Sequence, residues 1–241
     1  MTTKTGRIEV SGISVEVVRK AIKNLHIGVY PPDGRVRVAA PSRMTLDAIR
    51  LAVVGRLGWI RKHQQKFADQ VRQSPREYVS GETHYYRGRR YRLNVIPHNG
   101  HPRIVIRPGI LEMHVRQERD TDYRKRVLSA WYRQQLKEQI PSLIEKWEGI
   151  MGVVVAEWRI KQMKTKWGTC NMSARRIWLN LELIKKPEHC LEYLVVHEMT
   201  HLLERYHNDR FKSLMDTFLP QWQSYRKELN HMPLTHEEWE Y

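Results

Sequence analysis

Alternating apolar and polar residues in the first part of the chain predict β-strands. In the segment ISVEVVRK, Val15 and Val17 fall on one face, which is the two-residue period of a half-buried strand. Short turn sequences separate the other segments of this type, and a turn between two such segments predicts a β-hairpin. The predicted hairpins cover residues 25–40, 83–96 and 103–115, with turns at PPDG, Arg87-Gly88 and Pro108-Gly109.

Helical periodicity replaces this alternation in two longer segments. In residues 45–71, Ile49 and Val53 fall near one apolar stripe with a period of 3.6 residues, which predicts one amphipathic helix. Residues 122–140 predict a second, long helix. We expect Pro141 to end or kink that helix, because proline has no N–H to donate.

The last part of the chain predicts a small sheet followed by three helices. Residues 153–161 and 175–183 have the pattern of two strands that flank a loop. A helix is expected to begin beside Pro187, because proline and an acidic residue such as Glu188 both favour a first helical turn. Two shorter helices are predicted over residues 209–219 and 220–230.

The helix that begins beside Pro187 contains the sequence His-Glu-x-x-His. His197 and His201 are four residues apart, so their imidazoles point to the same side of a helix, one turn apart. Neutral imidazole suits Zn²⁺, which takes three protein ligands and keeps an open position in catalytic sites. Glu198 lies about 100° around the helix from His197 and can accept a proton from metal-bound water without being a ligand. The motif predicts a zinc-dependent hydrolase with Glu198 as its catalytic base.

The third ligand is predicted to be His207, which completes the spacing of zinc peptidases that carry HExxHxxGxxH. In those sequences the glycine lets the chain turn back, and Glu204 takes its place here. On a continuous helix His207 would point about 120° away from His201. The helix must therefore end near Arg205 or Tyr206 if His207 is a ligand. Glu204 itself, or a later carboxylate, is the alternative third ligand.

Three residues near the small predicted sheet are weaker candidates for the site. Asn180 is a polar residue of the strand over 175–183, which we expect to line the cleft where an extended peptide pairs. Lys166 can face an anionic group of a substrate. Cys170 is either a thiol beside the metal or, more commonly for a free cysteine, a buried core residue.

The formal charge of +16 is concentrated in the first half of the chain. Residues 1–120 contain 23 Lys and Arg against 10 Asp and Glu, whereas the remaining residues contain 19 against 16. Phosphate contacts need Lys and Arg, so the basic half is a candidate surface for nucleic acid or a nucleotide. A solvated basic surface would give the same composition.

Cysteine content and hydropathy indicate the compartment. The chain has no apolar run of 18 or more residues, which predicts no membrane-spanning helix, and its start lacks the apolar middle of a signal peptide. Its two cysteines, Cys170 and Cys190, form no CxxC pair. We therefore expect a reduced, cytoplasmic protein with no membrane partner.

The segments TKWGTC and RRIWLNLELIKKPEHCLEYLVVHEMTHLLERYHNDRF resemble the YgjP-like metallopeptidases, a family related to SprT-type zinc proteins. The resemblance extends over nearly the whole chain and is most specific from Lys166 to Phe211. Two residues depart from the family pattern: Thr169 replaces a serine, and Tyr206 replaces an asparagine that tolerates a left-handed turn better. The resemblance implies that zinc is bound by three histidines with a glutamate as general base, namely His197, His201, His207 and Glu198.

The expected fold is α+β, with a strand-rich basic region over residues 1–118 and a zincin-like metallohydrolase domain over residues 119–241. A metallopeptidase that acts on a peptide or protein is the leading function. The first alternative is a metal-dependent nucleoside triphosphate pyrophosphohydrolase, although the phosphate loop GxxxxGK[ST] is absent. The second is a nucleic-acid-associated zinc protein, although a structural zinc needs four ligands and only three candidates are found.

Overall fold

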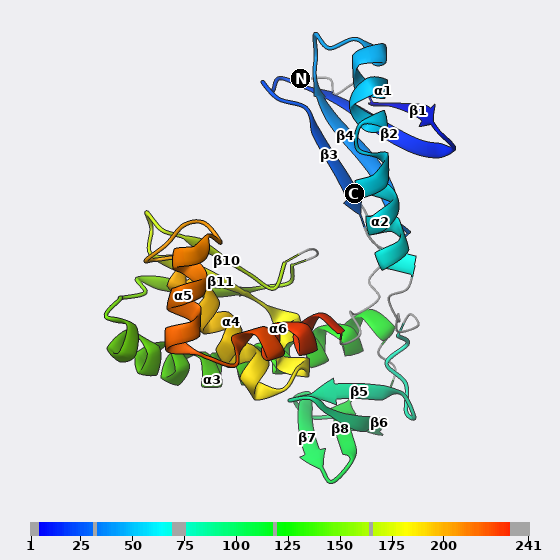
Figure 1. Ribbon diagram of the computed structural model, residues 1–241. Helices are drawn as coiled ribbons and strands as arrows, with labels where there is room; N and C mark the ends of the chain where they lie inside the picture. Colours follow the sequence, from blue (N-terminus) through cyan, green and yellow to red (C-terminus); the bar gives the residue numbers. More distant parts are fainter. Residues whose placement is uncertain (1–4, 31–32, 69–75, 118–119, 164–165, 232–241) are drawn as a thin grey trace. The chain divides into compact units, whose positions relative to one another are not determined.

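The computed structural model describes residues 5–30, 33–68, 76–117, 120–163 and 166–231 (Figure 1). The described residues form two compact units, the first within residues 5–68 and the second within residues 76–231. Each unit has its own hydrophobic core, so the two are described separately.

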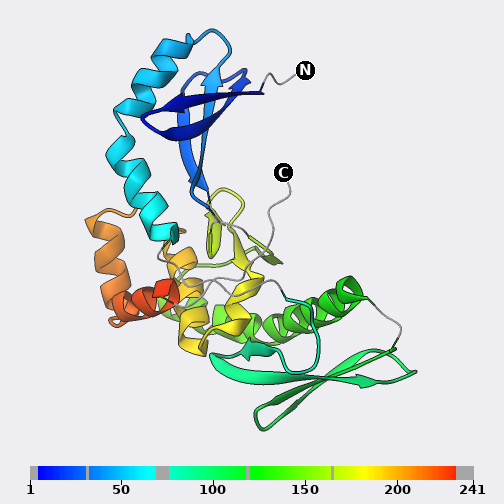
Figure 2. The same ribbon diagram turned by 90° about the vertical axis from the view of Figure 1, so that its right-hand side faces the viewer.

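The elements of the first unit are β1 (Thr5–Val10), β2 (Ile13–Lys20), β3 (His26–Tyr30), β4 (Arg35–Pro41), α1 (Leu46–Val54) and α2 (Leu57–Ala68). The four strands form one sheet in the order β1-β2-β4-β3, in which β2 and β4 are parallel. Val15, Val36 and Val38 are fully buried in one cluster with Ile49 of α1 and Ile60 of α2. The two helices therefore cover one face of the sheet, as Figure 2 shows.

The predicted strand over residues 13–20 and the hairpin of β3 with β4 are confirmed, whereas the single helix predicted over residues 45–71 is wrong. α1 ends at Val54, and α2 begins at Leu57. Gly55 lies at the break, and glycine costs about 1 kcal/mol relative to alanine in a helix interior. Residues 69–71 lie outside the described part of the chain.

The second unit begins with the strands β5 (Thr83–Tyr86), β6 (Arg89–Pro97), β7 (Arg103–Arg107) and β8 (Ile110–Val115), in the sheet order β5-β6-β8-β7. Both predicted hairpins are confirmed, since β5 pairs with β6 and β7 pairs with β8. Arg87 and Gly88 have φ angles of 49° and 76°, as a two-residue type I′ turn requires.

A long helix, α3 (Thr121–Met151), follows this sheet and is continuous through Pro141. Of the two outcomes expected at Pro141, an end of the helix is therefore wrong, and a kink stays a prediction. Pro141 cannot donate to the carbonyl of Lys137, but both residues are exposed, so water can hydrogen-bond that carbonyl. Ile140 and Ile144 on the other face are buried in the core and hold the helix in place.

Three short strands form the second sheet of this unit: β9 (Glu157–Lys161), β10 (Gly168–Asn171) and β11 (Arg176–Asn180), in the order β10-β11-β9. Two corrections follow. The segment predicted as a loop contains β10, and β11 is the central strand, so the prediction that it forms the edge of a cleft is wrong. β10 has only four residues, which is too few for an alternating pattern to mark it.

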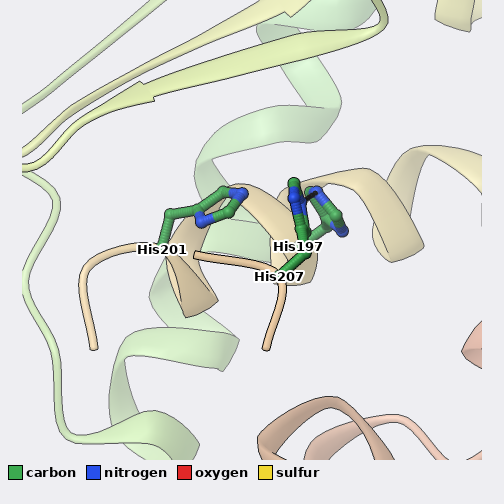
Figure 3. A group of neighbouring side chains, drawn as sticks. All are labelled: His197, His201 and His207. Carbon is green, nitrogen blue, oxygen red and sulfur yellow. Dashed lines mark hydrogen bonds between the residues drawn. The ribbon is translucent and has the colours of Figure 1, made fainter. Parts of the chain in front are cut away.

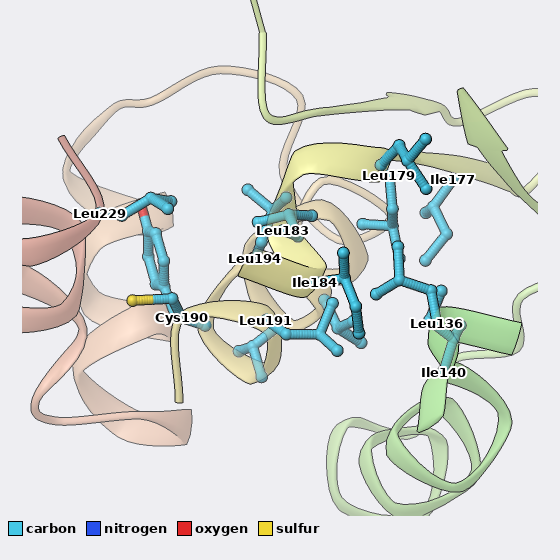
Figure 4. Packing of buried hydrophobic residues seen from close by; sticks show 14 of the residues in the cluster. Leu136, Ile140, Ile177, Leu179, Leu183, Ile184, Cys190, Leu191, Leu194 and Leu229 are labelled. Atoms are coloured by element: carbon cyan, nitrogen blue, oxygen red, sulfur yellow. The ribbon is translucent and has the colours of Figure 1, made fainter. Parts of the chain in front are cut away.

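The last four elements of the described residues are helical: η1 (Leu181–Lys185), α4 (Glu188–Thr200), α5 (Asp209–Phe218) and α6 (Trp222–His231). Figure 4 shows the part of the core that η1, α4 and α6 share with α3 and β11, and Phe211 and Met215 of α5 belong to the same cluster. Leu93 and Leu111 of the first sheet of the unit belong to the same buried cluster. These contacts group β5–β8 with the helices that follow them, and the division into a basic region and a metallohydrolase domain after residue 118 stays a prediction.

The turn between β5 and β6 is hydrogen-bonded to the segment that precedes α4. The N–H of Arg87 donates to the carbonyl of Ile184 at 2.9 Å, and the N–H of Gly88 donates to the carbonyl of Lys185 at 3.1 Å. Gly88 also lies against Pro187, because a β-carbon at residue 88 would stand 2.7 Å from Pro187 Cγ. This turn fixes the start of α4.

No helix among the described residues has the length and apolar content needed to cross a membrane.

Candidate metal centre

The last turn of α4 carries the His-Glu-x-x-His motif on a helix that is buried along most of its length. Val195 and Met199 are fully buried and face the core. The core contacts hold the helix, so His197, Glu198 and His201 are fixed by the packing of the opposite face.

The helix ends early enough for the third histidine to return to the other two. α4 ends at Thr200, followed by a turn, and Asn208 caps α5 by accepting a hydrogen bond from the N–H of Phe211 at 3.0 Å. Tyr206 has no positive φ angle, so replacing asparagine there introduces no left-handed strain. The short connection brings His207 beside His197 and His201, as Figure 3 shows.

The geometry of the three imidazoles fits a tetrahedral divalent ion. One ring nitrogen from each of His197, His201 and His207 lies within 4.8 Å of the others. The Nε2 atoms of His197 and His207 are 3.1 Å apart. Two nitrogens bound to one zinc at about 2.0–2.1 Å are separated by about 3.3 Å in tetrahedral coordination, so the rings need little movement.

The main chain orients the second histidine. Nδ1 of His201 lies 3.1 Å from the carbonyl oxygen of Glu204, which can only accept a hydrogen bond. The proton of His201 is therefore on Nδ1, and the lone pair of Nε2 is free for a metal. The carboxylate of Glu204 instead accepts from the N–H of Tyr206 at 3.2 Å and is outside the histidine group. The structure thus brings together His207, not Glu204, with the motif.

Phe211 of α5 supports all three rings from one side. Its ring centroid lies 5.0 Å from that of His197, 4.7 Å from that of His201 and 4.8 Å from that of His207. Phe211 is almost fully buried, so its own position is fixed. The sequence indicated Phe211 only as the end of the segment that resembles the YgjP-like family, without a role beside the histidines.

Burial favours the neutral form of all three histidines. It lowers the pKa of His197 to about 3, with smaller contributions from His201, His207 and the positive charge of Arg226. Burial also lowers the pKa of His201 and of His207. Neutral imidazoles have free lone pairs, which metal binding requires. Nδ1 of His197, the ring nitrogen that faces away from His207, is buried without a hydrogen-bond partner among the described residues.

Glu198 is a buried carboxyl beside the edge strand β10. Burial raises its pKa to about 8, and the positive charge of Lys166 acts in the opposite direction. Gly168 of β10 makes room for this side chain, because a β-carbon at residue 168 would stand 2.5 Å from Glu198 Oε1. The sequence singled out Glu198 and Lys166 but did not indicate this contact between Gly168 and Glu198.

Asn180 and Cys170, the remaining candidates, contact other parts of the protein. The amide nitrogen of Asn180 donates to the carbonyls of Met163 and Lys166, both at 2.8 Å, and its oxygen accepts from the N–H of Glu182 at 3.2 Å. Asn180 therefore links Met163, Lys166 and Glu182 by hydrogen bonds, and its part in binding a substrate stays a prediction. Cys170 is half-buried, and burial together with the charge of Glu198 raises the pKa of its thiol to about 11.

The chain is similar to one family of known sequences. A profile of the YgjP-like, metallopeptidase domain matches residues 23–232. The chain belongs to the YgjP-like metallopeptidase family. This membership confirms the resemblance seen in the sequence and the expectation of a metallopeptidase. No curated protein matches the chain.

Two solved structures are similar to part of the chain. The metallopeptidase zymogen abylysin of Pyrococcus abyssi has 20% sequence identity and a TM-score of 0.35, with 37% of this chain and 90% of that chain covered. The metallopeptidase zymogen jannalysin of Methanocaldococcus jannaschii has 17% identity and a TM-score of 0.34, with 37% of this chain and 92% of that chain covered.

Proposed function

We propose that this YgjP-like chain is a zinc-dependent peptidase in which His197, His201 and His207 hold the ion and Glu198 is the general base. The observation that carries the proposal is the convergence of three neutral imidazoles beside one buried carboxyl. Family membership supports the substrate class, since metallopeptidases act on peptides or proteins.

Glu198 is suited to move a proton in both directions. When bound, zinc supplies a Lewis acid that polarises a carbonyl and lowers the pKa of water towards about 7. Glu198 accepts a proton from the attacking water and returns it to the nitrogen of the leaving amine. Burial raises the pKa of Glu198 to about 8, and the charge of a bound divalent ion beside it would act in the opposite direction, like that of Lys166.

The edge of the second sheet offers a place for an extended substrate. β10 is hydrogen-bonded to β11 on one side only in the sheet order, and Gly168 at its start touches Glu198. An added peptide strand gains main-chain hydrogen bonds at such an edge. We infer that the scissile bond is presented along β10, in place of the edge that the sequence assigned to β11.

Replacing Glu198 by glutamine tests the assignment. Glu198→Gln keeps the shape of the side chain but removes the base, so the bound zinc should remain while kcat for peptide hydrolysis falls about 10²–10⁴-fold. Glu188→Gln is the matched control, because Glu188 lies on the same helix but is exposed in its first turn. Full activity of Glu198→Gln would contradict the proposed mechanism.

Nucleotide hydrolysis is measured in the same experiment. Release of phosphate or pyrophosphate from nucleoside triphosphates, with no cleavage of peptides or unfolded proteins, would assign the alternative reaction predicted from the sequence. Binding of nucleic acid or a nucleotide by the basic first half remains a prediction, and a steep loss of affinity with salt is its signature.

A further inference from the structure

A second group of metal-binding side chains lies at the other end of α4. His189 and Cys190 are in its first turn, and Glu228 is on α6. One ligand atom from each residue lies within 4.8 Å of the others, and Nε2 of His189 is 2.6 Å from Oε2 of Glu228. The three residues come from two helices, α4 and α6, that are far apart in the sequence. Only the folded chain brings their side chains together.

Neighbouring side chains fix each of the three residues. Leu229, next to Glu228, is buried in the core, and Figure 4 shows the sulfur of Cys190 on the same side of the cluster as Leu229. The ring of Tyr225, one turn before Glu228, packs on His189 with 4.7 Å between ring centroids. The three ligand atoms are therefore held close together before any ion binds.

Nitrogen, sulfur and carboxylate oxygen together suit a thiophilic divalent ion. Zn²⁺ binds neutral imidazole, thiolate and carboxylate, and one thiolate with one carboxylate would neutralise its two charges. Charge neutrality matters because Cys190 is fully buried, and burial raises the pKa of its thiol to about 12. The N-terminal end of α4 and the ammonium group of Lys186 both favour the thiolate.

We propose that His189, Cys190 and Glu228 bind a second thiophilic divalent ion, with Zn²⁺ as the expected species, that crosslinks the start of α4 to α6. The sulfur coordinates as a thiolate, so the thiol proton passes to solvent, and His189 keeps its proton on the ring nitrogen that does not bind the ion. The side chains of His189 and Glu228 are 37% and 41% exposed, which leaves the fourth position open to water.

The second ion acts on the position of α4 rather than on the reaction. Eight residues separate His189 from His197, which corresponds to about 12 Å along a helix axis. That distance is too long for both ions to contact one substrate bond, because two-metal sites hold their ions about 3.5–4 Å apart. The ion would instead fix the helix whose opposite end carries the three histidines.

Cobalt binding to the metal-free protein tests this inference. The full chain is stripped with a chelator and titrated with Co²⁺, the bound metal is counted by elemental analysis, and thiolate-to-cobalt charge transfer is followed in the near ultraviolet. About two ions per chain and a thiolate band are expected for the wild type. Cys190→Ser should bind about one ion and show no band, whereas the control Cys170→Ser should keep both.

Two further variants separate this site from the histidine cluster. His201→Ala should lose one ion but keep the thiolate band, so failure of the proposed catalytic site leaves this inference intact. Glu228→Gln, at a half-exposed position, should raise the cobalt concentration at half-saturation of the band at least about tenfold. A wild type without a thiolate band, a band that survives Cys190→Ser, or a band unchanged in Glu228→Gln would overturn the inference.

Discussion

Gly168 on the edge strand β10 lies directly against the carboxyl group of Glu198 on α4. A β-carbon at residue 168 would stand 2.5 Å from Glu198 Oε1 and 2.9 Å from its Cδ and Cγ atoms. Carbon atoms do not approach oxygen that closely without a shift. The absence of a side chain at residue 168 therefore sets the position of the proposed base.

Gly168→Ala should lower kcat about 10²-fold without loss of bound zinc, because a displacement of about 1 Å at a reacting group has that effect. The measurement is peptide hydrolysis beside metal analysis. Gly149→Ala on α3 is the control, since a β-carbon there meets no atom within 4 Å. Combining Gly168→Ala with Glu198→Gln should cause little further loss, and an additive loss would show that Gly168 acts elsewhere.

Gly88→Ala should destabilise the second unit more than Gly109→Ala does. Both glycines have positive φ angles, 76° and 70°, so alanine at either position costs about 1–2 kcal/mol of unfolding free energy. Only residue 88 would also clash with Pro187, whereas a β-carbon at residue 109 meets nothing within 4 Å. If urea unfolding shows the same loss of unfolding free energy in Gly88→Ala and Gly109→Ala, residue 88 does not contact Pro187 in solution.

Phe211→Ala should weaken both folding and metal binding. Removing a buried phenylalanine costs about 3–5 kcal/mol of unfolding free energy, and here it also removes the support of the three histidine rings. Met215→Ala is the matched control, because Met215 is fully buried on the same helix. We expect similar destabilisation in the two variants but a lower zinc affinity in Phe211→Ala alone, measured by competition with a chelating dye.

Acid should destabilise the protein partly through His84. This histidine is buried in β5, and burial, with smaller effects of the charges on Arg76 and Lys185, lowers its pKa to about 3. In the unfolded chain its pKa is about 6.5, so the unfolded state binds the extra proton between those two pH values. His84 therefore contributes stability above pH 6.5 that is lost as the pH falls, at a rate of at most about 1.4 kcal/mol per pH unit.

His84→Gln should flatten the fall in unfolding free energy between about pH 6 and pH 4, as measured by urea unfolding. His101→Gln serves as the control, since His101 is exposed. If both variants lose stability with acid as steeply as the wild type, His84 is not kept neutral by the fold.

The sequence predicted those parts of the fold that rest on local patterns. Hairpins β5–β6 and β7–β8 and the helix around His197 follow from residue periodicity and turn sequences that lie within one segment. The motif His-Glu-x-x-His also fixed the relation of His197 to His201, since helix geometry places residues four apart on one side. These predictions needed no knowledge of distant contacts.

Other features depend on contacts between distant segments, which periodicity does not encode. β10 is too short to show a pattern and exists because β11 pairs with it. The helix continues through Pro141 because the core holds its opposite face, and tertiary packing outweighs the propensity of one residue. The roles of Gly168 and Phe211 arise only where β10 and α5 meet the end of α4.

The two main-chain hydrogen bonds from the β5–β6 turn to η1 have a mechanical consequence. They connect the sheet of β5–β8 to the segment that precedes α4. Rotation of α4 is therefore resisted at its first residues as well as along its buried face. A ligand bound to this hairpin, or a proteolytic cut within it, would therefore shift the start of α4. Such a shift would change turnover without any contact with the histidines at the other end of the helix.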